Sequence, residues 1–195
     1  MPPPALPSSP PAPPARDDLA LARAGDQEAF ARLVRAHQAM VFSLAWRIAG
    51  DAAVAEELAQ EVFCQLFLHM DQIASDRHLL YWLRQVATRR ALDQWRRARL
   101  RRALPLTEAA TAPAPGSPGP PTDPWFEQRL RAALAGLTPE QRAVVALRYQ
   151  EELEPSEIAA LLRTPLLTVK SRLQRALRRL RGALSAPPDR SSDHA

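Results

Sequence analysis

Two proline-rich segments mark off the parts of this chain that can build a packed core. Residues 1–15 contain eight prolines and residues 105–124 contain seven. Proline fixes φ and lacks a backbone N–H, so such segments favour extended chain and add little to a packed core. We therefore predict five parts in order: a disordered tail (1–16), a first folded domain (17–104), a flexible linker (105–124), a second folded domain (125–184) and a disordered tail (185–195).

Apolar residues in both folded blocks recur at helical spacing, and no useful length of either alternates with period two. In the first block, Asp26 is placed to cap a helix that ends at Gly50. In the second block, Thr138 and Pro139 begin a helix, with Gln141 as the partner in a capping box. We predict an all-α protein of two small helical domains.

The end of the second block has the pattern of a helix-turn-helix motif. A short apolar helix follows Pro155, Thr164 and Pro165 interrupt it, and Thr168 opens a last helix with an apolar stripe on one side. The opposite side carries amide, hydroxyl and guanidinium groups, namely Ser171, Gln174, Arg175 and Arg178. Arginine pairs well with guanine and glutamine with adenine in the major groove. The sequence favours duplex DNA as the ligand, with an ordinary charged helical hairpin as the alternative.

Positive charge is concentrated in two runs. Residues 84–102 contain eight arginines and one acid, and residues 168–182 contain six basic residues and no acid, although the whole chain has a net charge of only +5. The rest of the chain is therefore net acidic. Two separate basic surfaces indicate a polyanion contacted at two places, whereas solvated helix faces would explain either run alone.

Composition argues against an enzyme, a metalloprotein or a membrane protein. Twenty prolines, six glycines and 6% aromatic residues do not suit a sheet-rich catalytic domain. Cys64 is the single cysteine, which excludes a disulfide framework and a multi-cysteine zinc site. We found no carboxylate pair, nucleophile and base set, or phosphate-binding glycine loop. We expect no catalytic residue, no cofactor, no metal, no membrane insertion and a cytoplasmic location.

Three segments together resemble the extracytoplasmic-function (ECF) group of bacterial sigma factors, the small promoter-recognition subunits of RNA polymerase. DAAVAEELAQEVFCQLF (residues 51–67) is similar to the core-binding segment of that family, and YWLRQVATRRALDQWRR (residues 81–97) to its promoter-melting segment. TVKSRLQRA (residues 168–176) is similar to part of its C-terminal DNA reader. The resemblance covers roughly residues 26–102 and 127–182.

The resemblance implies partners and roles for particular residues. It implies that Glu57, Gln60 and Glu61 bind the clamp helices of the largest subunit of core RNA polymerase, and that the second domain rests on the polymerase flap. It implies that the promoter minus-ten element is bound and opened by Arg84, Thr88, Arg89, Trp95, Arg96 and Arg97. It implies that the minus-35 element is bound by Thr168, Lys170, Ser171, Arg172, Gln174, Arg175 and Arg178. An anti-sigma factor is a further implied partner, which nothing in the sequence names.

The sequence also departs from the family pattern. Thr88 and Arg89 stand where the family commonly has arginine and asparagine, and Arg163 and Leu167 stand where it usually has glycine. A residue with a side chain at a glycine position requires a turn held by other means or a shifted recognition helix. We therefore expect a promoter sequence that cannot be copied from a relative.

Two other classes of protein remain as alternatives. A stand-alone helix-turn-helix regulator would use the first block to dimerise or to sense a signal, and would bind two-fold related half-sites without polymerase. An adaptor would dock its arginine-rich helices on acidic proteins. Charge reversal at Arg175 and Arg178 would then have no promoter-dependent effect.

Overall fold

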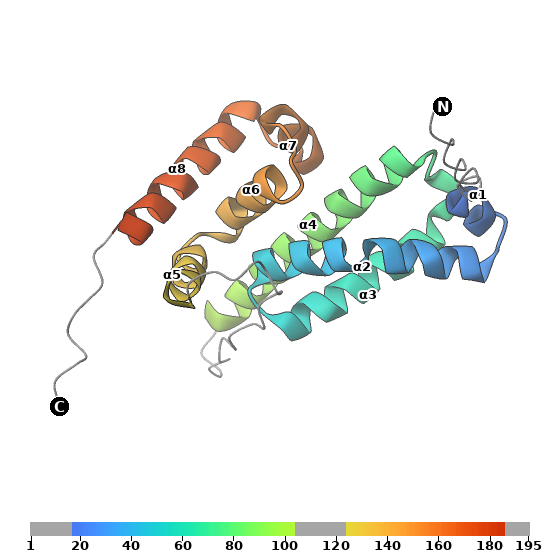
Figure 1. Ribbon diagram of the computed structural model, residues 1–195, viewed down its shortest axis with the longest axis horizontal. Helices are drawn as coiled ribbons and strands as arrows, with labels where there is room; N and C mark the ends of the chain where they lie inside the picture. Colours follow the sequence, from blue (N-terminus) through green and yellow to red (C-terminus); the bar gives the residue numbers. More distant parts are fainter. Residues whose placement is uncertain (1–16, 104–123, 186–195) are drawn as a thin grey trace, which may run out of the picture.

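The computed structural model describes residues 17–103 and 124–185, and every regular element in these ranges is a helix. The prediction of an all-α protein with two small domains is confirmed (Figure 1). The helices, in chain order, are α1 (Asp18–Arg23), α2 (Gln27–Ala49), α3 (Ala52–Leu68), the 3-10 turn η1 (Met70–Gln72), α4 (Asp76–Ala103), α5 (Pro124–Ala135), α6 (Pro139–Tyr149), α7 (Pro155–Leu162) and α8 (Leu166–Ser185).

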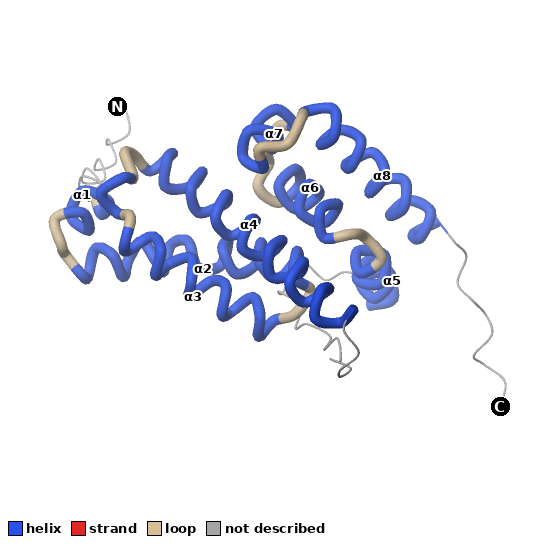
Figure 2. The backbone as a smooth tube through the Cα atoms, turned by 180° about the vertical axis from the view of Figure 1, so that it is seen from behind, coloured by secondary structure: helices blue, strands red, loops and turns tan. Residues whose placement is uncertain are grey.

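Helices α2, α3 and α4 form the body of the first domain, and the short α1 packs against α2 (Figure 2). The predicted cap at Asp26 is present, because its Oδ1 accepts the N–H of Ala29 at 3.0 Å. Gly50 ends α2 in the left-handed region, with φ of 81°. Asp51 then caps α3 by accepting the N–H of Val54 at 3.2 Å. The chain therefore reverses direction within two residues.

The second domain is built from α5 to α8. Thr138 and Gln141 form the predicted capping box at the start of α6, with N···O distances of 3.0 and 3.3 Å. The predicted start of the last helix at Thr168 is wrong by two residues, since α8 begins at Leu166. The carbonyl of Pro165 accepts the N–H groups of Thr168 and Val169, at 2.9 and 3.1 Å, and so supports the earlier start.

The predicted tails and linker lie almost wholly outside the described residues. Two residues assigned to them lie inside helices, because α5 begins at Pro124 and α8 ends at Ser185. Proline is well tolerated in the first turn of a helix, where its missing N–H has no helical partner.

The two domains pack directly against each other. Helix α2 contacts α6, and α4 contacts both α6 and α7 (Figure 2). Buried residues of both domains, such as Leu44 and Ile48 on α2 and Val144 and Leu147 on α6, belong to one hydrophobic cluster. The interface between the domains is thus an apolar core with polar contacts around it.

Candidate polymerase and nucleic-acid interfaces

The three residues assigned to polymerase binding lie together on α3. Glu57, Gln60 and Glu61 are exposed and line one shallow surface depression, which Arg90 of α4 borders. The spacing of three and four residues places all three on one side of the helix. Arg90 Nη1 donates to Glu61 Oε2 at 2.9 Å, which leaves Glu57 and Gln60 as the outer part of this acidic face.

The acidic face lies away from the second domain. Helix α3 packs on α2 and α4, whereas α6 and α7 pack on the other side of those helices (Figure 1). A partner protein can therefore reach Glu57, Gln60 and Glu61 while the two domains remain packed.

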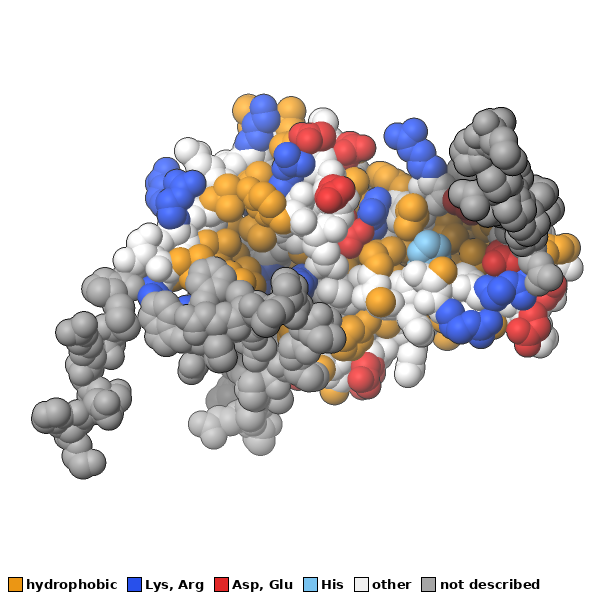
Figure 3. Space-filling model, in the orientation of Figure 1, with side chains coloured by type: hydrophobic (Ala, Val, Ile, Leu, Met, Phe, Trp, Pro, Cys, Tyr) orange, Lys and Arg blue, Asp and Glu red, His pale blue; other side chains and the backbone are white. Residues whose placement is uncertain are grey.

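Arg84, the first residue assigned to the minus-ten element, is held by the second domain. Its Nε donates to Glu151 Oε2 at 2.7 Å, and only 5% of the Glu151 side chain is exposed. The next residue, Gln85, donates from Nε2 to the carbonyl oxygen of Leu161 at 3.1 Å. That carbonyl lies in the last turn of α7, where helical carbonyls lack an internal partner. Acidic and basic side chains lie side by side where α7 meets α4 (Figure 3).

Thr88 also fails to reach the surface. It lies one helical turn after Arg84, it is completely buried, and its hydroxyl oxygen has no hydrogen-bond partner among the described residues. An unsatisfied buried hydroxyl is unfavourable and calls for an explanation. In this arrangement the Thr88 side chain is not open to a DNA strand, and its assignment to the minus-ten element stays a prediction.

The C-terminal half of α4 is more open. Arg89 and Trp95 are half-buried, and Arg96 and Arg97 are exposed. Arg96 Nη1 donates to Asp93 Oδ1 at 2.6 Å across one turn. The guanidinium carbon of Arg99 lies 5.5 Å from the centroid of the Trp95 ring, within the range of a cation–π contact. An aromatic ring among arginines is thus present where the sequence predicts contact with single-stranded DNA.

Helix α8 lies at the outer edge of the second domain (Figure 1). Val169 and Ala176 are buried on the inner side. We define the reader face as the outward residues Lys170, Ser171, Gln174, Arg175 and Arg178, all exposed except the half-buried Ser171. Arg175 Nη2 donates to Ser171 Oγ at 2.6 Å, which orders part of this face. The other two residues assigned to the minus-35 element, Thr168 and Arg172, are half-buried beside it.

Sequence analysis missed the polar residues at the interface between the domains. Glu151 lies in the turn between α6 and α7 and is not part of any helical pattern. Gln150 Nε2 donates to Ser43 Oγ of α2 at 3.1 Å. No local motif marks either residue, because each acts through a partner that is distant in the chain.

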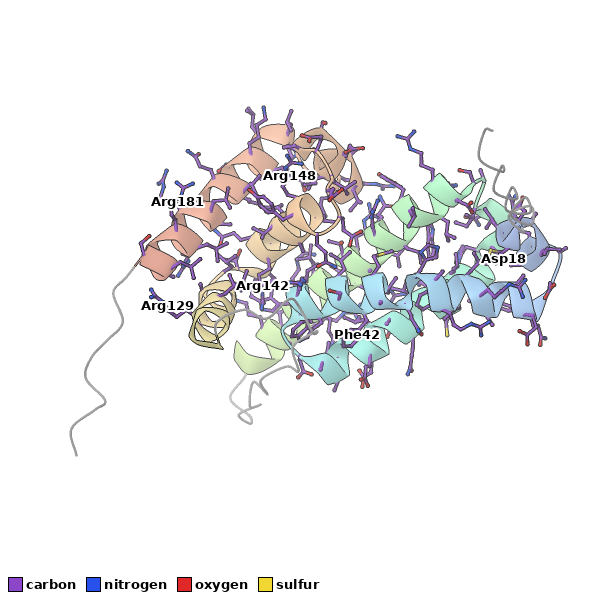
Figure 4. All side chains as sticks on the ribbon, viewed as in Figure 1. Asp18, Phe42, Arg129, Arg142, Arg148 and Arg181 are labelled. Atoms are coloured by element: carbon purple, nitrogen blue, oxygen red, sulfur yellow. The ribbon has the colours of Figure 1, made fainter. Side chains whose placement is uncertain are left out.

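Arg142 is a second missed feature. It extends from α6 to the C-terminal end of α2 (Figure 4), where a Cβ placed on Gly50 would lie 2.9 Å from Arg142 Nη1. Burial lowers the pKa of Arg142, with Glu140 opposing the shift. A cation is favoured at the C-terminal end of a helix by the helix dipole, which offsets part of the cost of burial.

His37 lies on α2, and its surroundings shift its pKa. Burial lowers its pKa from 6.5, the nearby Asp76 opposes this shift, and the charge of Arg84 adds to it. Arg84, which pairs with Glu151 of the second domain, therefore also lowers the pKa of His37 in the first domain.

Comparison with known proteins identifies the family. Residues 33–101 match the family described as Sigma-70 region 2, and residues 127–180 match Sigma-70, region 4. The ECF RNA polymerase sigma factor SigW of Bacillus subtilis is 30% identical over 172 residues, which cover 82% of this chain and 91% of SigW. The chain belongs to the ECF group of RNA polymerase sigma factors. The resemblance seen in the sequence is confirmed.

Two further sigma factors are similar to this chain. The ECF RNA polymerase sigma factor SigL of Mycobacterium tuberculosis is 34% identical over 162 residues, covering 80% of this chain and 92% of SigL. A relative from Xanthomonas campestris is 33% identical over 173 residues, and this chain spans 43% of its length.

Two solved structures share the fold of this sigma factor. One is the sigma factor RpoE in complex with the anti-sigma factor NepR from Bartonella quintana, with a TM-score of 0.66 and 21% identity over 81% of this chain and 98% of that one. The other is CnrH in complex with the cytosolic domain of CnrY, with a TM-score of 0.60 and 23% identity over 87% of this chain and 96% of that one.

Within residues 17–103 and 124–185, no helix is both long and apolar enough to cross a membrane. In the same ranges, no three His, Cys, Asp or Glu side chains are grouped to hold a metal ion.

Proposed function

We propose that this sigma factor joins core RNA polymerase to a promoter by three surfaces. The acidic face of α3 binds the clamp helices of the largest polymerase subunit. Helix α4 binds and helps to open the minus-ten element, and the reader face of α8 binds the minus-35 element while the second domain rests on the flap. The chain carries out no chemical step and acts in the cytoplasm.

The chemistry of each surface supports this assignment. Carboxylates and amides on α3 complement a basic partner helix and accelerate the encounter with it. Aromatic rings and guanidinium groups on α4 suit single strands, because bases stack on rings while arginines hold phosphates. Amide and guanidinium groups on α8 suit base edges in the major groove, and the remaining cations suit the phosphates.

The observation that carries the proposal is that some of these surfaces are exposed to a partner while the domains are packed and others are not. The acidic face and the reader face are open, whereas Arg84 and Thr88 on α4 are covered or paired while the domains stay packed. We infer that polymerase binds first through α3, and that the domains must separate before Arg84 of α4 reaches DNA. The 20 residues from 104 to 123 can span at most about 70 Å, which allows a wide separation.

An anti-sigma factor is a further proposed partner. One of the solved structures described above contains a sigma factor bound to an anti-sigma factor, and the other contains CnrH bound to the cytosolic domain of CnrY. A protein that binds across both domains of this chain would hold them together and keep Arg84 away from DNA.

Transcription in vitro with purified core polymerase and a library of random promoters tests the proposed function. We expect start-site selectivity only when this chain is added. A footprint on two-fold related half-sites without polymerase would instead support the stand-alone regulator. Absence of selectivity on every template would reject the proposed function.

A further inference from the structure

Leu167 on the first turn of α8 is a large apolar side chain that is 79% exposed. Isolated exposed leucines are common and usually need no explanation. Leu167 differs because of its position on the helix. Lys170, Ser171 and Gln174 follow it by three, four and seven residues, the spacing of a single helix face. Leu167 therefore extends the reader face by one turn toward the N-terminus.

The position of Leu167 limits what it can contact. In a helix-turn-helix motif, residues near the N-terminus of the recognition helix contact base edges in the major groove. The largest apolar group that a base presents there is the C5-methyl group of thymine. Arg175 and Arg178 on the same face supply positive charge that complements the phosphates of duplex DNA. Charge complementarity thus favours DNA as the occupant over another protein.

We propose that Leu167 determines specificity by contacting a thymine methyl group within the minus-35 element. The inference rests on the proposed function, because it requires that the reader face enters duplex DNA. It predicts a preference for thymine at one position, in addition to the bases that Gln174 and Arg175 select.

The test uses holoenzyme reconstituted from core polymerase and the full chain, with promoters selected from a random library. Each thymidine in the selected minus-35 element is replaced in turn by deoxyuridine, which removes the methyl group and keeps the base pair. We expect one replacement to weaken promoter binding about three- to fivefold, the effect of exposing one buried methyl group. The same replacement should have no effect on holoenzyme carrying Leu167→Ala, which retains a good helix former.

A matched control is Leu21→Ala, where the leucine is 40% exposed and lies on α1, at the opposite end of the molecule from α8 (Figure 1). This variant should keep the full sensitivity to deoxyuridine. Equal sensitivity in wild type and Leu167→Ala, or none at any position in wild type, would overturn the inference. A loss of core polymerase affinity in Leu167→Ala without a change in methyl dependence would also overturn it, by showing a protein contact. Failure of the wild-type chain to select any promoter would instead reject the proposed function itself.

Discussion

Arg84 and Glu151 lie 67 positions apart in the chain and form an ion pair of 2.7 Å between the two domains. Glu151 is almost fully covered, and a buried carboxylate is stable only when it is paired and hydrogen-bonded. Arg84 is also one of the residues assigned to promoter DNA. The ion pair holds Arg84 against the second domain with only 21% of its side chain exposed, so domain packing and contact with a DNA phosphate compete for its position.

We expect Glu151→Gln to weaken the packing of the two domains by about 1.5 to 3 kcal/mol, the range for hydrogen bonds to charged groups. The loss of charge leaves Arg84 largely buried and without its carboxylate partner. Small-angle X-ray scattering should show a larger radius of gyration. Glu152→Gln is the control, because Glu152 is the adjacent exposed carboxylate. Equal dimensions of both variants and wild type would contradict the competition described above.

The same substitution should improve DNA binding by the free chain. With Arg84 released, Glu151→Gln should bind a single-stranded minus-ten oligonucleotide more tightly than wild type at low salt. Fluorescence anisotropy measures this difference. Arg84→Ala combined with Glu151→Gln should remove the gain. A gain that persists in the double variant would show that Arg84 is not the competing group.

Glu57→Arg should reduce the affinity for core polymerase by tenfold or more, on the order of a like-charge contact in a protein interface. Glu57 suits the test because it is exposed and is not part of the ion pair between Glu61 and Arg90. The control is Glu56→Arg, which makes the same charge change at the adjacent position, outside the depression. Co-purification with core polymerase gives the measurement. Equal loss in both variants would indicate a general charge effect rather than a docking site.

Gly50→Ala should destabilise the protein more than Gly25→Ala. Both glycines have positive φ, of 81° and 93°, so a side chain at either costs about 1 to 2 kcal/mol. Only at Gly50 would the added Cβ meet Arg142, and displacing that half-buried group should add about 1 kcal/mol. Urea denaturation of the two variants measures the difference. Equal destabilisation would show that Arg142 moves aside freely.

Acidification should destabilise the packed structure through His37. Its pKa is below 6.5 in the folded protein, so the unfolded chain binds the proton more readily. The contribution of His37 to the free energy of unfolding is complete above pH 6.5. It is lost as the pH falls from 6.5 toward the lowered pKa of His37 in the folded protein. His37→Gln should make the free energy of unfolding less dependent on pH in this window. An unchanged dependence would show that other groups dominate.

The sequence was sufficient to predict the helical class, the caps at Asp26 and Thr138, and the family. These features depend on local chemistry and spacing, which a single segment contains. The acidic residues of α3 could also be placed on one face, because positions 57, 60 and 61 follow the helical repeat.

The packing of the domains could not be predicted in this way. Glu151, Gln150 and Arg142 each act on a residue in the other domain, and no local pattern in the sequence specifies that partner. Thr88 was assigned to DNA from the family resemblance alone, and a resemblance in sequence does not show whether a side chain is buried. The start of α8 at Leu166 was missed because the carbonyl of Pro165 serves the first turn in place of a side-chain cap.

The shared hydrophobic cluster has a consequence for how the molecule unfolds. Because Leu44 and Ile48 pack in the same cluster as Val144 and Leu147, neither domain can melt without exposing apolar surface of the other. Heating should then produce one calorimetric transition whose van't Hoff enthalpy accounts for the entire molecule. When polymerase separates the domains, each domain keeps only its own smaller hydrophobic core. Binding to polymerase then stabilises both domains.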